Sequence, residues 1–378
     1  MYIGVPAESA AGETRVAATP ETVKKLVAQG HSVRVQSGAG VAASAPDAAY
    51  QAVGAEVVAA ASALGAELVL KVRAPSAPEL AHMRPGATLV GMLNPFDAAG
   101  LAALAQAGLT SFALEAAPRT TRAQSLDVLS SQANIAGYKA VMLAANQYQR
   151  LFPMLMTAAG TIKAARLVVL GVGVAGLQAI ATAKRMGAVI EASDVRPSVK
   201  EQVESLGAKF IDVPFDTAEE KEAAEGVGGY ARPMPPSWLE RQKIEVAKRV
   251  AQADVVISTA LIPGRAAPTL ITEDMVRSMK PGSVIVDLAA GKGPDGVGGN
   301  CPLTEADRTV QKHGVFLIGE TNLPALVAAD SSALYARNVL DFLKLVLPKD
   351  ASAVQVPLDD DIVAACLMTH QGEVRRKP

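Results

Sequence analysis

Aromatic side chains, cysteines and any excess of charge are scarce in this chain of 378 residues. Phe, Trp and Tyr together make up 4% of it, which is too few for the stacking platforms that bind single-stranded nucleic acids. The 36 basic and 37 acidic residues nearly cancel, and the basic residues form no stripe, so we expect no nucleic-acid partner. Half of the residues are hydrophobic, which provides for globular cores of ordinary size.

The two cysteines, Cys301 and Cys366, form no Cys-x-x-Cys pair, which favours reduced thiols in the cytoplasm over a disulfide framework. The four histidines are far apart in the sequence, so we expect no metal site. Residues 1–5 have the composition of a first strand, and we therefore expect no secretory leader.

Residues 167–183 carry no charge, but a stretch of this length is marginal for crossing a bilayer, and glycines interrupt it. We interpret it as a strand that leads into Gly171-x-Gly173-x-x-Gly176 and then a helix that ends near Gly187. In a dinucleotide-binding fold the first glycine makes a tight turn, the second lets the backbone approach the pyrophosphate, and the third lets helix and strand pack closely. The N-terminus of the helix then offers free N–H groups and the positive end of its dipole to the phosphates. The alternative is a glycine-rich turn in an unrelated α/β domain.

A second strand-like run, residues 188–193, ends at Asp194, which lies 18 residues after Gly176. This is about where a carboxylate binds the adenosine ribose in such folds. A carboxylate there favours a ribose 2′-hydroxyl and repels a 2′-phosphate, so the sequence predicts NAD(H) as the cofactor. Arg196 is close enough to receive a phosphate and leaves NADP(H) as the alternative.

Strand-like and helix-like patterns alternate along most of the chain, which predicts parallel sheets covered on both faces. Before the glycines we predict strands at residues 2–5, 32–36, 67–72, 87–93 and 110–114, and helices at 20–30, 46–53 and 97–107. Further strands are predicted at residues 166–170, 188–193, 209–213, 255–259, 283–287 and 315–318. Long helices are predicted at 130–150 and after 321, with short strands at 353–356 and 362–368.

The predicted fold is therefore α/β, with two Rossmann-like domains that have parallel sheets, are joined by two long helices and have a cleft between them. We expect residues 1–128 plus 322–378 to form a discontinuous first domain and residues 129–321 to form the NAD(H)-binding domain. Residues 118–131 form a polar segment between these domains. Residues 226–236 hold three Gly and three Pro around Tyr230, which is typical of a lid or of a surface loop without a role.

Six segments together resemble one family over essentially the whole chain, far more specifically than the glycine motif alone. The family is the NAD(H)-binding alpha subunit (domain I) of proton-translocating nicotinamide nucleotide transhydrogenase, and alanine dehydrogenase is a relative of the same fold. The segments are residues 119–127, 130–138, 156–161, 171–185, 259–264 and 298–302.

The resemblance implies roles for particular side chains. Those that orient the nicotinamide or contact it would be Arg119, Gln124, Ser125, Leu126, Asp127 and Ser130. Those around the pyrophosphate and the adenosine ribose would be Gly171, Gly173, Val174, Gly176, Asp194, Val195 and Arg196. A mobile loop with Gly229 and Tyr230 would close over NAD(H), and Leu261 would line the pocket.

The resemblance also implies the reaction and the partners. Hydride would pass from NADH to NADP⁺ bound on a partner subunit, coupled to proton translocation by a membrane-embedded subunit. Because we find neither a second fingerprint nor a transmembrane stretch near the end of the chain, we expect those components to be separate polypeptides. The chain would be a homodimer in the cytoplasm, held peripherally at the inner face of the cell membrane through its partners.

The rival interpretation is an amino-acid dehydrogenase like alanine dehydrogenase. By resemblance that enzyme uses an Arg and a Lys that match Arg15 and Lys71, and Lys71 otherwise reads as a snorkelling surface lysine. It also uses a His where this chain has Asn94, which does not titrate and is no general acid or base. It has an acid where this chain has residues 289–291, Ala-Ala-Gly. An insertion at residues 292–297 makes correspondences in that region less direct. A third possibility is a protein that senses NAD(H) without catalysis.

Overall fold

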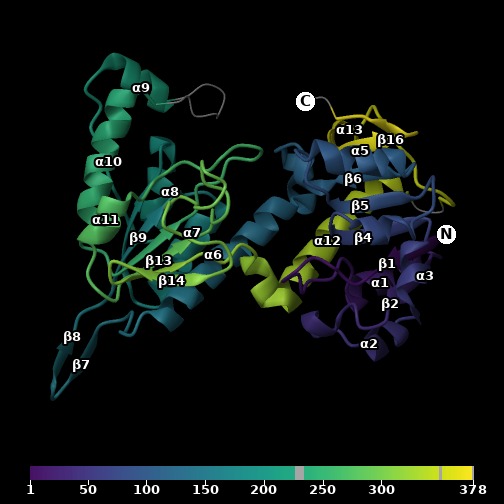
Figure 1. The fold of residues 1–378 in the computed structure, drawn as a ribbon, viewed down its shortest axis with the longest axis horizontal. Helices are drawn as coiled ribbons and strands as arrows, with labels where there is room; N and C mark the ends of the chain where they lie inside the picture. The colour runs from purple at the N-terminus through teal and green to yellow at the C-terminus, as the bar shows by residue number, and fades with distance from the viewer. Residues whose placement is uncertain (226–233, 349–350, 377–378) are drawn as a thin grey trace. The chain divides into compact units, whose positions relative to one another are not determined.

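The computed structural model describes residues 1–225, 234–348 and 351–376. The chain divides into two compact units, each built around one large sheet. Unit 1 comprises Met1–Gln132 and Pro324–Pro378, and unit 2 comprises Ala133–Leu323 (Figure 1). The fold is α/β with two domains, as predicted.

Unit 1 holds an eight-stranded sheet in the order β17-β16-β6-β5-β4-β1-β2-β3. Its strands are β1 (Tyr2–Val5), β2 (Ser32–Gln36), β3 (Glu56–Val58), β4 (Leu68–Arg73), β5 (Thr88–Met92), β6 (Thr110–Ala113), β16 (Leu367–His370) and β17 (Glu373–Val374). The first six strands are parallel, but β16 pairs antiparallel with β6, and β17 pairs antiparallel with β16. The sequence patterns did not predict β3, β17 or the antiparallel edge.

Helices cover both faces of this sheet. They are α1 (Pro20–Ala28), α2 (Asp47–Gln51), α3 (Ala60–Leu64), α4 (Ala77–Leu80), α5 (Ala98–Gln106), α12 (Ala328–Val346) and α13 (Asp361–Cys366). Leu68 and Leu70 of β4 lie in one core with α1 and α12, while Val69 lies in the other core with α5. A strand buried on both faces in this way reads as a continuous apolar run, which is why β4 was predictable.

The predicted strands at residues 353–356 and 362–368 are wrong. Residues 353–356 form no regular element, and residues 361–366 form the helix α13 before β16 begins. The Asp360 carboxylate accepts hydrogen bonds from the N–H groups of Ile362 at 2.9 Å and Val363 at 3.2 Å, and so caps the helix. A short apolar run does not reveal its period, and the cap decides for the helix.

Unit 2 holds a seven-stranded sheet in the order β11-β10-β9-β12-β13-β15-β14. Its strands are β9 (Arg166–Leu170), β10 (Val189–Ser193), β11 (Lys209–Phe210), β12 (Val255–Ser258), β13 (Val284–Asp287), β14 (Thr309–Lys312) and β15 (Val315–Ile318). All of them are parallel except β14, which the sequence did not predict. The six parallel strands, from β11 to β15 in the sheet, have the order of a dinucleotide-binding sheet. This order reverses between β9 and β12.

The helices of unit 2 lie on both faces of its sheet. They are α7 (Val174–Arg185), α8 (Lys200–Ser205), α9 (Ala218–Glu225), α10 (Pro236–Val250) and α11 (Glu273–Ser278), and α6 (Val128–Gln147) runs from unit 1 into unit 2. Leu167 and Val169 of β9 lie in a core with α7, while Val168 and Leu170 lie in a core with α10 and α11. The uncharged stretch is thus β9 followed by α7. No helix in the described part of the chain is long and apolar enough to span a bilayer.

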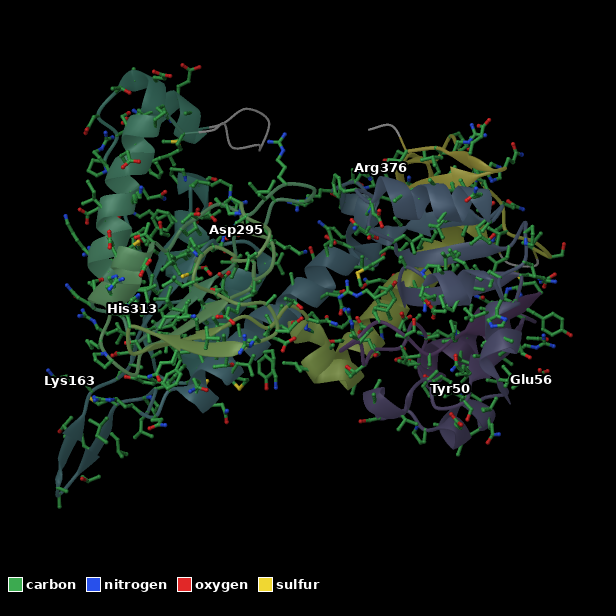
Figure 2. All side chains as sticks on the ribbon, viewed as in Figure 1. Tyr50, Glu56, Lys163, Asp295, His313 and Arg376 are labelled. Atoms are coloured by element: carbon green, nitrogen blue, oxygen red, sulfur yellow. The ribbon has the colours of Figure 1, made fainter. Side chains whose placement is uncertain are left out.

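A small hairpin of β7 (Leu155–Thr157) and β8 (Gly160–Ile162) projects from the body of unit 2 (Figure 1). Lys163 follows it at its base (Figure 2). Every residue of the two strands is exposed, including Met156 at 71%. The sequence did not predict the hairpin, because strands of three residues give almost no alternation.

Candidate functional site

The order of the strands in unit 2 reverses between β9 and β12, and ligands of such sheets bind outside the carboxyl ends of the strands at this point. Gly171 follows β9 with a φ of +94°, a conformation that favours glycine. A Cβ on Gly176 would lie 2.0 Å from the Gly171 carbonyl oxygen, so α7 packs against the turn only without a side chain there. A Cβ on Gly173 would meet no atom of the described chain within 4 Å, so this glycine faces open space.

Two contacts fix the turn to neighbouring elements of unit 2. The Thr259 hydroxyl, just after β12, donates a hydrogen bond of 2.9 Å to the Gly171 carbonyl oxygen. On the other side, a Cβ on Gly137 of α6 would lie 2.1 Å from the Ala175 carbonyl oxygen in the first turn of α7. The turn is therefore attached to the end of β12 by a hydrogen bond, and to α6 by a backbone approach that leaves no room for a side chain at Gly137.

Asp194 lies directly beside the turn and is 8% exposed. Its carboxylate accepts hydrogen bonds from the Val172 N–H at 2.7 Å and the Arg196 N–H at 2.9 Å. The Arg196 guanidinium binds the same carboxylate at 2.9 and 3.0 Å, and this bond raises the pKa of Arg196. Arg196 is therefore held by Asp194, and its charge is already compensated within the chain.

Three apolar side chains near this edge of the sheet are open to solvent. Val174 begins α7 with 36% exposure, Val195 follows Asp194 with 48%, and Leu261 follows β12 with 45%. Exposed apolar side chains beside a polar turn are typical of a surface on which a cofactor lies. Gly229 and Tyr230, the expected lid residues, lie outside the described residues.

Sequence reasoning missed Asp287 and Asn300, which fix the loops after β12 and β13. Asp287 is fully buried and accepts hydrogen bonds from the N–H groups of Ala289 and Cys301 at 3.0 and 2.9 Å. The Asn300 amide binds both the N–H and the carbonyl oxygen of Ala260, at 3.1 and 2.9 Å. An acid at the carboxyl end of a predicted strand was the available signal for Asp287.

Residues 292–297 form a surface turn next to this network (Figure 2). The Asp295 carboxylate closes the turn by accepting hydrogen bonds from the N–H groups of Val297 at 2.9 Å and Gly298 at 3.0 Å. Val297 is 61% exposed. That these residues are an insertion stays a prediction, and the turn closes through its own hydrogen bonds.

The polar segment of unit 1 forms a 3₁₀ helix, η3 (Thr121–Leu126), followed by Asp127 at the start of α6. The Asp127 carboxylate accepts hydrogen bonds from the Ser130 N–H at 2.9 Å and the Ser130 hydroxyl at 2.5 Å, which caps α6. Arg119, Gln124 and Ser125 are exposed. Leu126 is 3% exposed and lies in the core of unit 1.

Arg15 and Lys71 belong to a buried cluster of charges in unit 1. The Lys71 side chain is 0% exposed and pairs with Glu79 at 2.8 Å and Glu8 at 3.2 Å, so it is no snorkelling surface lysine. Arg15 pairs with Glu13 at 2.6 Å and donates a hydrogen bond of 2.7 Å to the Gln132 side-chain oxygen. Both cations are compensated by carboxylates of the chain itself.

Asn94, where the rival enzyme has a His, is exposed and has a φ of +55°. Its backbone N–H donates a hydrogen bond of 2.7 Å to Glu115. Burial raises the pKa of Glu115 to about 6. In the described part of the chain, no three His, Cys, Asp or Glu side chains are grouped so that they could hold a metal ion.

Both units match models of one protein family. Residues 4–136 match the alanine dehydrogenase/PNT N-terminal domain, and residues 140–377 match the alanine dehydrogenase/PNT C-terminal domain. The chain belongs to the alanine dehydrogenase/PNT family. The resemblance noted in the sequence is thereby confirmed.

Individual relatives cover nearly the whole chain. It is 49% identical to an NAD(P) transhydrogenase subunit alpha chain of Rhodospirillum rubrum, over 99% of this chain and 97% of that one. Among solved structures, the transhydrogenase from Sinorhizobium meliloti superposes with a TM-score of 0.88 at 46% identity, covering 99% of this chain and 100% of that one. An L-alanine dehydrogenase superposes with a TM-score of 0.79 at 26% identity, covering 99% and 96%.

The glycines of the turn make separable predictions. Gly173→Ala adds a methyl group in open space, so it should change the free energy of unfolding by at most about 1 kcal/mol while weakening NADH binding at the pyrophosphate. Gly176→Ala should lower the free energy of unfolding by about 1–3 kcal/mol, because the methyl group meets the Gly171 carbonyl oxygen. Urea unfolding and NADH fluorescence titration measure the two effects. Unchanged NADH binding by Gly173→Ala would contradict the assignment of the turn.

Glu115 predicts a pH dependence of stability. Because its pKa rises from 4.5 to about 6 on folding, the folded chain holds this proton more tightly than the unfolded chain. The stability that it contributes is present below pH 4.5 and is lost as the pH rises through 6, by about 2 kcal/mol. Glu115→Gln should therefore stabilise the chain more at pH 7.5 than at pH 4.5 in urea unfolding. The exposed Glu201→Gln is the control, and an equal effect of Glu115→Gln at both pH values would refute the prediction.

Proposed function

We propose that the chain is the NAD(H)-binding subunit of a proton-translocating nicotinamide nucleotide transhydrogenase. The observation that carries this proposal is the 49% identity to the Rhodospirillum rubrum chain, an NAD(P) transhydrogenase subunit alpha, over 97% of that chain's length. In this role the chain binds NADH, and hydride passes to NADP⁺ held by a partner subunit. A membrane-embedded partner couples the transfer to proton translocation, which keeps the chain at the inner face of the cell membrane.

Unit 2 supplies the binding surface for NAD(H). The pyrophosphate lies over Gly173, where a side chain is missing, and meets the N-terminus of α7 at Val174. Asp194 lies beside the adenosine ribose, and its carboxylate, already bound by Arg196, offers no attraction to a 2′-phosphate. The Arg196 guanidinium is already bound by Asp194, so it contributes little to the binding of a 2′-phosphate. Val195 and Leu261 provide apolar contact with the adenosine and the pocket.

The segment from Arg119 to Ser130 orients the nicotinamide ring and its carboxamide. Hydride passes directly between two nicotinamide rings, so no side chain has to accept or release a proton. The segment therefore contributes orientation and proximity. Asp127 suits this role, because the Ser130 hydroxyl and N–H hold its carboxylate in one place.

The alternative is an amino-acid dehydrogenase. The superposition with L-alanine dehydrogenase supports it, and so does the presence of Arg15 and Lys71. That reaction moves a proton as well as a hydride and needs a titrating group near the substrate. Asn94 does not titrate, and residues 289–291 supply no acid. The transhydrogenase role requires neither group.

The chain acts as a homodimer. The hairpin of β7 and β8 supports this proposal, because exposed apolar side chains gathered on a projecting element are typical of an interface. On the two strands they are Leu155, Met156 and Ile162, with exposures of 43%, 71% and 46%, and Leu151 and Met154 just before the hairpin add 41% and 60%.

Hydride transfer tests the function directly. Gln124→Ala and Asp127→Asn should slow transfer from NADH to NADP⁺ by about 10- to 100-fold with the partner subunit present, because the ring loses its orientation. NADH affinity should fall less, and Asn at position 127 still caps α6. Stopped-flow absorbance with saturating nucleotides measures the rate. Transfer at the parent rate would refute the roles of both residues, and turnover of pyruvate with ammonium would support the dehydrogenase instead.

The dimer proposal has its own test. Met156→Glu places a charge on the exposed hairpin and should shift the particle from two chains to one in light scattering at micromolar concentration. Val297→Glu, which charges a similarly exposed apolar position on the insertion, should leave the dimer intact. A parent chain that is already monomeric would show that the chain is no homodimer.

A further inference from the structure

The polar segment of unit 1 is held by a side chain of α12, another element of the same unit. Asn338 lies on α12, far along the chain from the segment, and is 7% exposed. Its amide nitrogen donates a hydrogen bond of 2.7 Å to the Ser125 carbonyl oxygen. Its amide oxygen accepts a hydrogen bond of 2.7 Å from the Ser131 hydroxyl. The two polar atoms of one planar amide therefore bind the chain, one before Asp127 and the other after it.

The two hydrogen bonds of Asn338 attach the segment to α12, which the hydrogen bonds within the segment do not do. Asp127 and Ser130 bind each other, which shapes the start of α6 but ties neither of them to another element. The two bonds of Asn338 join positions six residues apart to a single rigid group on α12. Both bonds are 2.7 Å long and end on an Asn338 side chain that is 7% exposed, so it is costly to leave this amide without its partners.

Other ties to the segment differ in kind. Gln132 donates a hydrogen bond of 3.1 Å to the Ser331 carbonyl oxygen and so binds the first turn of α6 to α12, beyond the nicotinamide-facing residues. Arg122 pairs with Asp360 at 2.6 Å and with Asp361, but it is half exposed, and exposed ion pairs contribute little. Asn338 is thus the buried tie that acts on Ser125 itself.

We propose that Asn338 is a positioning residue for hydride transfer. It holds Gln124, Ser125 and Asp127 in the position and orientation that the nicotinamide requires. The proposal rests on the proposed transhydrogenase function. It gives Asn338 no contact with the cofactor and no part in the chemistry. Its effect is on the rate of transfer, since the surface that binds the pyrophosphate and the ribose lies in unit 2.

The test removes the amide and separates rate from binding. Asn338→Ala should slow hydride transfer about tenfold or more at saturating nucleotides, because a shift of the segment on the order of 1 Å misorients the ring. The dissociation constant for NADH should stay within about threefold of the parent value. The rate is expressed per NADH-binding site, so a loss of folded protein does not imitate the effect. Asn338→Asp keeps the acceptor for Ser131 and loses the donor to Ser125, so it should also transfer slowly.

Ser332→Ala is the matched control. Ser332 lies on the same helix, is fully buried, and accepts a hydrogen bond of 3.0 Å from the Val16 N–H, away from the segment. It should lower stability and leave the rate per site at the parent value. Ser131→Ala, which breaks only one of the two bonds of Asn338, serves if Asn338→Ala does not fold, and it should transfer hydride more slowly than the parent.

The outcomes separate this proposal from the one on which it rests. A parent chain that binds NADH but transfers no hydride with its partner would overturn the proposed function and Asn338 with it. A parent chain that transfers hydride, while Asn338→Ala and Asn338→Asp do so at the same rate per site, would overturn Asn338 alone. Equal slowing by Ser332→Ala would show that any loss of a buried bond on α12 has this effect, and would also overturn the assignment.

Discussion

The contact between α7 and the turn after β9 is the constraint on which the candidate site of unit 2 depends. A side chain at Gly176 would lie 2.0 Å from the Gly171 carbonyl oxygen, so helix and turn meet backbone to backbone. The same carbonyl oxygen accepts the Thr259 hydroxyl, and α6 approaches α7 through Gly137. Because these contacts close three sides of the turn, the N–H groups at the start of α7 have a fixed direction. In the proposed function, the pyrophosphate meets these donors without any rearrangement of the turn.

The two units handle buried charge in different ways. Asp287 in unit 2 is fully buried and is balanced by N–H and hydroxyl donors, while Lys71 and Arg15 in unit 1 are balanced by the carboxylates of Glu79 and Glu13. Removing one partner of such a group costs more than the net value of the pair, since the other stays in the interior. These side chains therefore have a sufficient physical reason to be present without any ligand.

The doubly wound core and the turn were predictable, because strands buried on both faces give continuous apolar runs and the glycines have a spacing set by geometry. Residues 362–368 were not, since a short apolar run fits helix or strand and only the Asp360 cap decides. The hairpin was too short to show a period. Asn338 was invisible for another reason: its partners, Ser125 and Ser131, are far away in the sequence, and no local pattern records a long-range hydrogen bond.

In the proposed hydride transfer, long-range ties to the polar segment matter more than titrating groups. When two nicotinamide rings exchange a hydride, the barrier depends on the distance and angle between them, and no proton has to be delivered. An enzyme for this reaction can hold an Asn where an amino-acid dehydrogenase needs an imidazole. Under the proposed function, Asn94 lies where no acid–base residue is needed, and Asn338 lies where the polar segment has to be positioned rigidly. In the proposed reaction, the packing behind the polar segment therefore sets the geometry of transfer.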